Sequence, residues 1–216
     1  MEKMLVTQAL DERDLLVKKI AGKIKGAEFI TTVRNNEEKV QNGKATRQEF
    51  EERAKAQFQQ IEDLIARYQR LDAAIIYSNA TTLIEVDGKP YSVAAAIAFR
   101  ARLKGKGDVQ TDFELLLATQ MEEAYNSAVR VAELQNQKLQ STAETMRNSI
   151  LGKDSKVKED APLAVVDVYV RENTCELVDP LKVKQKVKSL VEKRDSLLRE
   201  LDTAIKVANA TTMIEF

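Results

Sequence analysis

One segment of the chain occurs twice. Residues 71–86 read LDAAIIYSNATTLIEV, and residues 201–216 read LDTAIKVANATTMIEF. The two segments are offset by 130 positions with no gap, and ten of their sixteen positions are identical. A match of this extent between distant parts of one chain indicates a duplicated structural unit.

Each copy predicts a helix that ends at a corner and continues as a strand. Asn79 and Asn209 stand where a long helix must end, and Asn tolerates the left-handed backbone of a helix C-terminus. Two threonines follow, and their β-branching favours extended backbone. We therefore expect residues 71–86 and 201–216 to superpose as helix, corner and strand, with both strands in one small sheet.

Helical spacing of apolar residues predicts a first helix over about Thr7 to Lys25. The β-branched segment from Ala27 to Val33 predicts a strand, and Asn42-Gly43 predicts a turn. Thr46 and Glu49 have the spacing of a capping box. The helix that starts there carries an apolar stripe over about thirty residues and is expected to stop near Asn79.

The middle of the chain predicts a turn and two further helices. Asp87-Gly88 is the expected turn after the first repeated strand, and Ser92 is a plausible N-cap of an Ala-rich helix that reaches about Lys104. Thr111 and Glu114 form a second capping-box match, and the helix they start is expected to extend to about Ile150. Its length of about 60 Å predicts that it projects, breaks or packs on another subunit.

The remaining segments predict a strand pair and a last helix. Leu163 to Val170 has the strongest strand pattern of the chain, and Cys175 to Val178 is its expected hairpin partner. We expect Val165 to Val170 to join the sheet of the repeated strands. Asp179-Pro180 predicts an N-cap and a first helical position for a helix that reaches about Ala208. The expected fold is mostly α with a small β component (α+β), built from long antiparallel helices in one domain over residues 1–216.

Composition excludes several classes of function. The chain has no histidine and one cysteine, Cys175, which removes Ser-His-Asp and Cys-His catalysis and the usual zinc sites. Lys and Arg number 34, equal to Asp and Glu, and this balance argues against a general nucleic-acid binder. Residues 1–5 mix charges and lack an apolar core, so we expect no secretion signal, and no apolar run is long enough to span a bilayer. We expect a cytoplasmic protein without a membrane partner, catalytic residue, metal or cofactor.

One set of polar residues is a candidate binding site for an anionic small molecule such as a nucleotide. Guanidinium groups and hydroxyls together suit phosphate. The alternative is structural: the Asn and Thr side chains cap helix ends, and the arginines pair with Glu85 and Glu215. The candidate residues lie at the two corners and on the helix that follows the first: Asn79, Thr81, Thr82, Arg100, Arg102, Asn209, Thr211 and Thr212.

The first corner and its surroundings also resemble a known group of proteins. A helix that ends in Asn79-Ala-Thr-Thr, a short strand, Asp87-Gly88 and the segment Tyr91 to Arg100 together look like the septicolysin-like small helical proteins of bacteria and their phages. The resemblance covers roughly Asp63 to Lys104 and the last twenty residues. It implies a bacterial or phage origin, and the family has no settled activity to carry over. The cytolysin suggested by its name is not transferred, because the chain shows no membrane-inserting segment.

These observations predict a non-catalytic, homo-oligomeric binding or assembly protein of bacterial or phage origin. Long helices with continuous apolar stripes, together with the missing histidine and nucleophile motifs, favour this interpretation. The alternative is a small-molecule binder that sequesters an anionic, nucleotide-like ligand, for example a phage protein that counters a host defence. An enzyme based on Asp, Glu or Lys is the third hypothesis, and a metal requirement would favour it.

Overall fold

The computed structural model describes residues 2–34, 37–40, 44–107, 111–153 and 161–216. The chain is mostly helical, and its short strands form small antiparallel sheets, so the predicted fold class is confirmed. Its contacts divide it into two compact units, one made of Met1–Ala101 with Leu197–Phe216 and the other of Arg102–Ser196. That these units form one domain stays a prediction.

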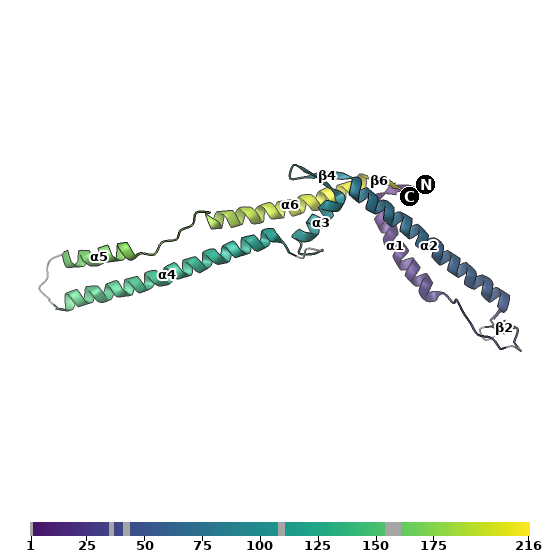
Figure 1. Cartoon of the computed structure of the whole chain (residues 1–216), viewed down its shortest axis with the longest axis horizontal. Coiled ribbons are helices and arrows are strands. Elements are labelled where there is room, and N and C mark those ends of the chain that lie inside the picture. Colours follow the sequence, from purple (N-terminus) through teal and green to yellow (C-terminus); the bar gives the residue numbers. More distant parts are fainter. Residues whose placement is uncertain (1, 35–36, 41–43, 108–110, 154–160) are drawn as a thin grey trace. The chain divides into compact units, whose positions relative to one another are not determined.

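The elements are labelled in Figure 1. In chain order they are β1 (Lys3–Leu5), α1 (Val6–Gly26), β2 (Lys39–Val40), β3 (Ala45–Thr46), α2 (Arg47–Thr81), β4 (Leu83–Val86), β5 (Lys89–Ser92), α3 (Val93–Leu103), α4 (Phe113–Lys153), α5 (Ala161–Asn173), α6 (Val183–Thr211) and β6 (Met213–Glu215).

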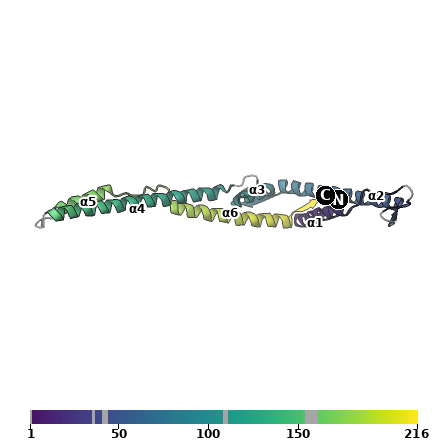
Figure 2. The ribbon, with the colours of Figure 1, turned by 90° about the horizontal axis from the view of Figure 1, so that it is seen from below.

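Helices α1 and α2 form the longer part of the first unit and lie side by side (Figures 1 and 2). The predicted capping box starts α2: the Glu49 amide donates to Thr46 Oγ1 at 3.2 Å, and the Thr46 amide donates to Glu49 Oε2 at 2.8 Å. The bounds of α1 and α2 lie within two residues of those predicted from the sequence. A buried cluster joins them to the last strand, and its members are Val6, Ala9, Leu16, Leu71, Ile75 and Ile214.

The strand predicted from Ala27 to Val33 is wrong, because this segment has no regular secondary structure. The segment packs along the side of α2 instead. The Glu28 amide donates to Gln57 Oε1 at 3.2 Å, and Phe29 packs edge-to-face on Phe58 with ring centroids 6.4 Å apart. These contacts with a helix replace the ladder that a strand would need. The turn predicted at Asn42-Gly43 lies outside the described residues.

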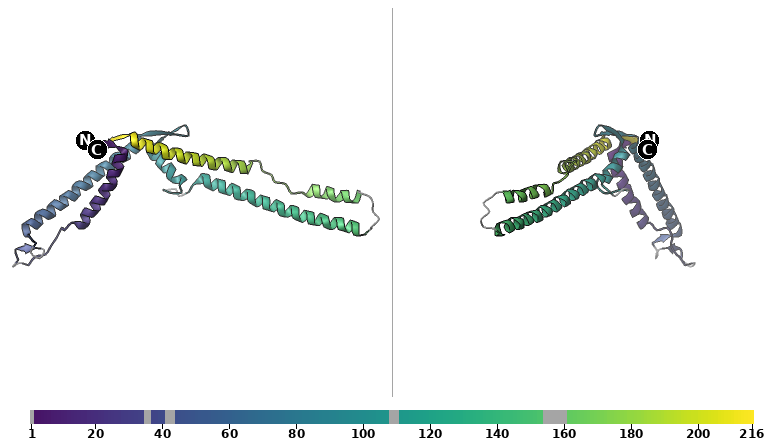
Figure 3. Two further views of the ribbon diagram at one scale, coloured as in Figure 1. Left: turned by 180° about the vertical axis from the view of Figure 1, so that it is seen from behind. Right: turned by 60° about the vertical axis from the view of Figure 1, so that its left-hand side comes forward.

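The described strands form three separate two-stranded sheets, so the prediction of one small sheet is wrong. Strand β4 pairs with β5 through the predicted turn, where Asp87 and Gly88 both have positive φ, 51° and 68°. Strand β6 pairs with β1 at the other end of the sequence, and Glu2 and Phe216 exchange two backbone hydrogen bonds of 3.2 Å. The N- and C-termini therefore lie next to each other, as Figure 3 shows.

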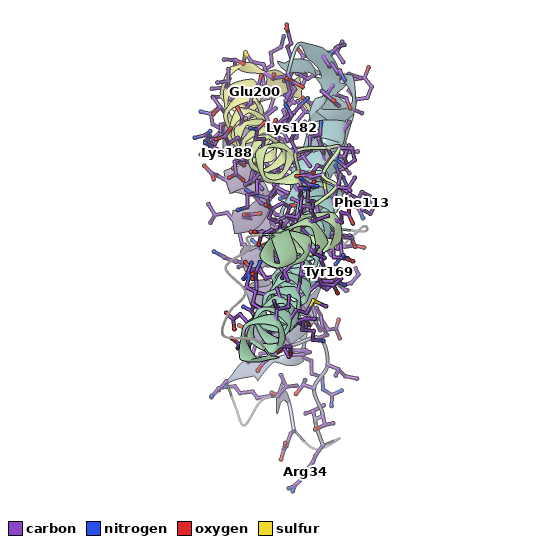
Figure 4. The ribbon with its side chains drawn as sticks, turned by 90° about the vertical axis from the view of Figure 1, so that its left-hand side faces the viewer. Arg34, Phe113, Tyr169, Lys182, Lys188 and Glu200 are labelled. Atoms are coloured by element: carbon purple, nitrogen blue, oxygen red, sulfur yellow. The ribbon has the colours of Figure 1, made fainter. Side chains whose placement is uncertain are left out.

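In the second unit, α5 packs against α4 (Figure 1). The strand predicted from Leu163 to Val170 is wrong, because these residues belong to α5. Packing on α4 outweighs the β-propensity of the valines: Val166 is buried, and Arg147 pairs with Asp167 at 2.8 Å. Figure 4 labels Tyr169 on α5, and its carbonyl accepts from Asn173 Nδ2 at 2.9 Å near the helix end.

The segment between α5 and α6 contains no strand, so the hairpin predicted for Cys175 to Val178 is wrong. The amide side chain of Asn136 takes the place of a partner strand: it donates to the Cys175 carbonyl at 2.9 Å and accepts from the Cys175 amide at 2.8 Å. The carboxylate of Asp179 accepts from the Val183 amide at 3.0 Å, but Lys182 and not Asp179 is the residue before α6, so the predicted N-cap position is wrong. Pro180 likewise lies in a turn before the helix rather than at its first position.

The start of α4 differs from its prediction. Its N-cap is Asp112, which accepts from the Leu115 amide at 3.0 Å, so the capping box predicted for Thr111 and Glu114 is wrong. The Asp112 carboxylate also accepts from Arg194 Nε at 2.6 Å, and Arg194 Nη2 donates to the Leu103 carbonyl at 2.7 Å. This largely buried ion pair ties α6 to the start of α4. The 41 residues of α4 span about 60 Å at the usual helical rise.

Candidate functional site

The first corner is built by hydrogen bonds at the end of α2. The Thr82 amide donates to the Ser78 carbonyl at 2.8 Å, and Thr81 Oγ1 donates to the Tyr77 carbonyl at 2.9 Å. Thr82 itself is extended, with φ −73° and ψ 125°, and β4 follows it. The two threonines thus satisfy the last carbonyls of the helix and begin the strand.

The second corner repeats this arrangement at the end of α6. The Thr212 amide donates to the Ala208 carbonyl at 2.9 Å, and Thr211 Oγ1 donates to the Val207 carbonyl at 2.9 Å. The prediction that both copies form helix, corner and strand is therefore confirmed.

The role expected of the two asparagines is wrong. Asn79 and Asn209 lie within the last helical turns, and the helices end two residues later. Among the described residues other than glycine, positive φ occurs at Asp87 and Lys182. Neither asparagine therefore adopts the left-handed backbone, and the turn out of each helix is made by Thr82 or Thr212.

The duplication extends beyond the two segments that the sequence shows. The Thr82 carbonyl accepts from the Val93 amide, the first residue of α3, at 3.0 Å. The Thr212 carbonyl accepts from the Val6 amide, the first residue of α1, at 3.0 Å. Strand β5 with α3 is thus the counterpart of β1 with α1, and the second copy is completed by the other end of the chain.

Four identical pairs support this second equivalence, at an offset of 87. They are Val6 and Val93, Ala9 and Ala96, Arg13 and Arg100, and Leu16 and Leu103. The valines, alanines and leucines are buried in both helices, and the arginines are half-buried. The pattern Val-x2-Ala-x3-Arg-x2-Leu was the signal that a search for internal repeats could have used.

Arg100 belongs to this repeated framework. Its Nη1 lies 3.2 Å from Asp202 Oδ1, and the equivalent Arg13 Nη1 lies 3.5 Å from Asp72 Oδ1. Asp72 and Asp202 are themselves equivalent positions of the repeat. The same ion pair therefore links α3 to α6 in one copy and α1 to α2 in the other. The pairing expected from the sequence, with Glu85 or Glu215, is not the one that Arg100 makes.

Arg102 lies in the second unit and also has an acidic partner. Its guanidinium makes two hydrogen bonds to the Glu114 carboxylate, at 2.7 and 2.8 Å, and lies over the Phe113 ring at 5.1 Å from the centroid. The hydrogen bond from Arg102 holds the pKa of Glu114 below its ordinary value. A bidentate pair of this kind occupies the guanidinium face that a phosphate would use.

A groove of about 350 Å³ lies between the two corners. It brings together three of the candidate residues, Thr82 from the first copy with Thr211 and Thr212 from the second. Asn79, Thr81 and Asn209 are not part of its lining. The full lining is Thr82, Leu83, Ile84, Glu85, Ala204, Val207, Ala208, Thr211 and Thr212.

The chemistry of this groove suits an apolar group better than an anion. Its lining contains neither Lys nor Arg, and its one charged side chain is the carboxylate of Glu85. Thr211 Oγ1 already donates to its own helix. Binding of an anionic molecule by the predicted residues stays a prediction. The lining of the groove contains no positively charged side chain that would attract such a molecule.

Two further features, a metal-binding cluster and a membrane-spanning helix, are absent from the part of the chain that the structure describes. No three His, Cys, Asp or Glu side chains gather there closely enough to hold a metal ion, and no described helix has the length and apolarity to cross a membrane. In comparisons with known proteins, no family model, no curated protein and no solved structure matches the chain.

Proposed function

We propose that the protein is a non-catalytic, homo-oligomeric binding or assembly protein of bacterial or phage origin. The observation that carries this proposal is the amount of surface that the single chain exposes. Its solvent-accessible area is 15785 Å² for a mass of 24.3 kDa. Two compact folded units of that total mass would together expose about 12,000 Å² by the scaling of monomeric proteins.

The difference of about 3,800 Å² per chain is at least as large as the roughly 1,000–2,500 Å² that each partner of a permanent assembly buries. Part of the exposed area is apolar. In the first unit, Ile30 is 89% and Tyr77 is 72% exposed, and in the second, Val178 is 92% and Val165 is 67% exposed. Contiguous apolar patches, more than single exposed side chains, mark the surfaces that other molecules cover.

The second unit offers two grooves that fit this role. One, of about 450 Å³, lies between α4 and the extended segment around Val178, and Ala124, Ala128 and Ala132 are part of its lining. The other, of about 420 Å³, lies between α4 and α5 near Met146 and Tyr169. Both linings are mainly apolar, as expected for surfaces that receive side chains of a protein partner.

Light scattering on a size-exclusion column, combined with a thermal-shift panel of nucleotides, tests the proposal. We expect a mass of at least two chains, twice 24.3 kDa or more, and no thermal shift with any nucleotide. A monomer at every concentration that a nucleotide stabilises would overturn the proposal and favour the anionic-ligand alternative.

A further inference from the structure

Part of α4 is covered by extended backbone instead of a second helix. The segment between α5 and α6 runs along α4 (Figure 1). Asn136 holds one end of this segment at Cys175, and at the other end Lys184 lies over the Tyr125 ring, 5.0 Å from its centroid. From Tyr125 to Asn136, α4 rises about 16 Å. The groove of about 450 Å³ lies along this stretch, and we call it the Val178 groove.

The Val178 groove brings exposed apolar side chains together into one patch. Val131 of α4 is 51% exposed, and Leu177 and Val178 of the extended segment are 42% and 92% exposed. All three line the same groove, so their surface is contiguous. Ala124 and Ala128, one helical turn apart in the same lining, are too small to fill the space beside them. A contiguous apolar patch of this kind marks an interaction surface.

The second apolar groove, between α4 and α5, opens on the same side of α4. Met146 lines it and lies eighteen residues after Ala128, which is about five full helical turns. On α5, Val165 lines the second groove, and Glu172 follows it by seven residues, close to two turns. Glu172 therefore lies on the side of the Val178 groove.

The first turns of α6 carry four lysines, which divide between two sides of the helix. Lys184 lines a further groove together with Asn126, and Asn126 lies about 200° around α4 from Ala124 of the Val178 groove. The same angle of about 200° separates Lys184 from Lys186 on α6. Lys182 and Lys186, one turn apart, therefore lie on the side of the Val178 groove.

The other two lysines lie on the opposite side. Lys188 follows Lys184 by one helical turn, so both share a side of α6. Figure 4 agrees with this division: Lys188 and Tyr169, which lines the second apolar groove, lie on opposite sides of the helices. One side of α6 thus serves as an internal reference for the other.

The side of the Val178 groove has an acidic half and a basic half. Glu172 and Glu176 lie before Val178 in the chain, and Lys182 and Lys186 lie after it. All four charged side chains are exposed. Within the part of the chain that the structure describes, none of them has an ion-pair or hydrogen-bond partner. The two lysines also stand at the N-terminal end of α6, where positive charge is unfavourable.

We propose that this side of the second unit binds the same side of a second copy of the chain, about a two-fold axis near Asp179. The charges are placed evenly about that residue: Glu176 and Lys182 are each three positions away, and Glu172 and Lys186 are each seven. A two-fold axis uses the same patch on both partners. It brings the acidic half of each copy onto the basic half of the other, so every contact occurs twice.

The patch itself favours a second copy over other occupants. A polyanion attracted by Lys182 and Lys186 would be repelled by Glu172 and Glu176, whereas a second copy offers both charges in the matching order. Val178 lies between the two halves, so it meets its counterpart at the centre, as expected for an apolar core with a polar rim. The inference rests on the proposed function, because it names the surface through which the homo-oligomer forms.

Sedimentation equilibrium on two charge-reversal variants tests the inference. One carries Lys182→Glu with Lys186→Glu, and the other carries Glu172→Lys with Glu176→Lys. Each variant alone places like charges opposite one another across the axis, so we expect its dissociation constant to rise at least about tenfold above that of the parent. An equimolar mixture of the two restores opposite charges at every contact and should recover most of the association.

The matched control is Lys184→Glu with Lys188→Glu, which makes the same change of charge in the same helix on the opposite side. We expect the control to associate as tightly as the parent. Circular dichroism verifies that every variant folds. The substituted side chains are exposed, and glutamate at the start of α6 or lysine at the end of α5 suits the helix dipole.

Charge-reversal variants that associate as tightly as the parent, or a mixture that associates no better than either variant alone, would overturn the inference and leave the proposed function intact. A control weakened as much as the Lys182→Glu, Lys186→Glu variant would do the same. A parent chain that stays monomeric would overturn both. Should a reversal variant unfold, Val178→Gln at the 92% exposed site decides: we expect weaker association, and unchanged association would refute the inference.

Discussion

The duplication predicts that equivalent buried residues contribute equally to stability. Leu71 on α2 and Leu201 on α6 occupy the same position of the repeat, and both are fully buried. Replacement by alanine removes three carbon atoms from each site. The lost transfer free energy is about 2.4 kcal/mol at roughly 0.8 kcal/mol per carbon, and the cavity left behind brings the total to about 3–4 kcal/mol.

Urea unfolding followed by circular dichroism at fixed protein concentration measures both effects. Leu71→Ala and Leu201→Ala should lower the free energy of unfolding by amounts that agree to within about 1 kcal/mol. Leu15→Ala, at an exposed site of α1, is the control and should change it by less than about 0.5 kcal/mol. A cost below about 1 kcal/mol at one leucine and above about 3 kcal/mol at the other would refute the equivalence of the copies.

Three further outcomes follow from single contacts. Thr46→Ala removes the side-chain acceptor of the α2 capping box and should cost about 1 kcal/mol in urea unfolding, whereas Thr46→Ser should restore most of it. The ion pair of Arg102 with Glu114 should contribute its full stabilisation above the pKa of Glu114 in the unfolded chain, about 4.3. This stabilisation should be lost as the pH falls through the lower pKa of Glu114 in the folded chain. Glu114→Gln should flatten the dependence of the unfolding free energy on acid pH, and an unchanged profile would contradict the assignment. Arg194→Met leaves the Asp112 carboxylate, 8% exposed, without its main partner and should destabilise the chain by about 3 kcal/mol in thermal unfolding, while a cost near zero would show that water replaces the arginine.

The sequence predicted those elements whose signals are local. The capping box at Thr46 and the turn at Asp87-Gly88 depend on a few neighbouring residues, and both are confirmed. The corners were predicted for the same reason, since the end of each helix and the start of each strand lie within one short repeated segment. The end of each helix was predicted two residues too early, at Asn79 and Asn209. The hydroxyls of Thr81 and Thr211 donate to carbonyls of the preceding turn and continue each helix to the threonine.

The predictions that failed depended on distant contacts. Leu163 to Val170 is β-branched and apolar, yet it packs as a helix on α4, and nothing local in its sequence signals that partner. The pairing of β1 with β6 joins the two ends of the chain, so the strand partners expected from chain order were wrong. In the candidate site, Arg100 pairs with Asp202 and Arg102 with Glu114. These pairings could not be predicted, because each partner lies on another helix that only the fold brings close.

Native mass spectrometry of the purified, unmodified chain tests the central claim most directly, because it reports the oligomer and any retained small molecule together. The account predicts a species of two or more chains, with a mass at least twice 24.3 kDa, that carries no stoichiometric adduct. A species of one chain with an anionic molecule bound in a one-to-one ratio would contradict it.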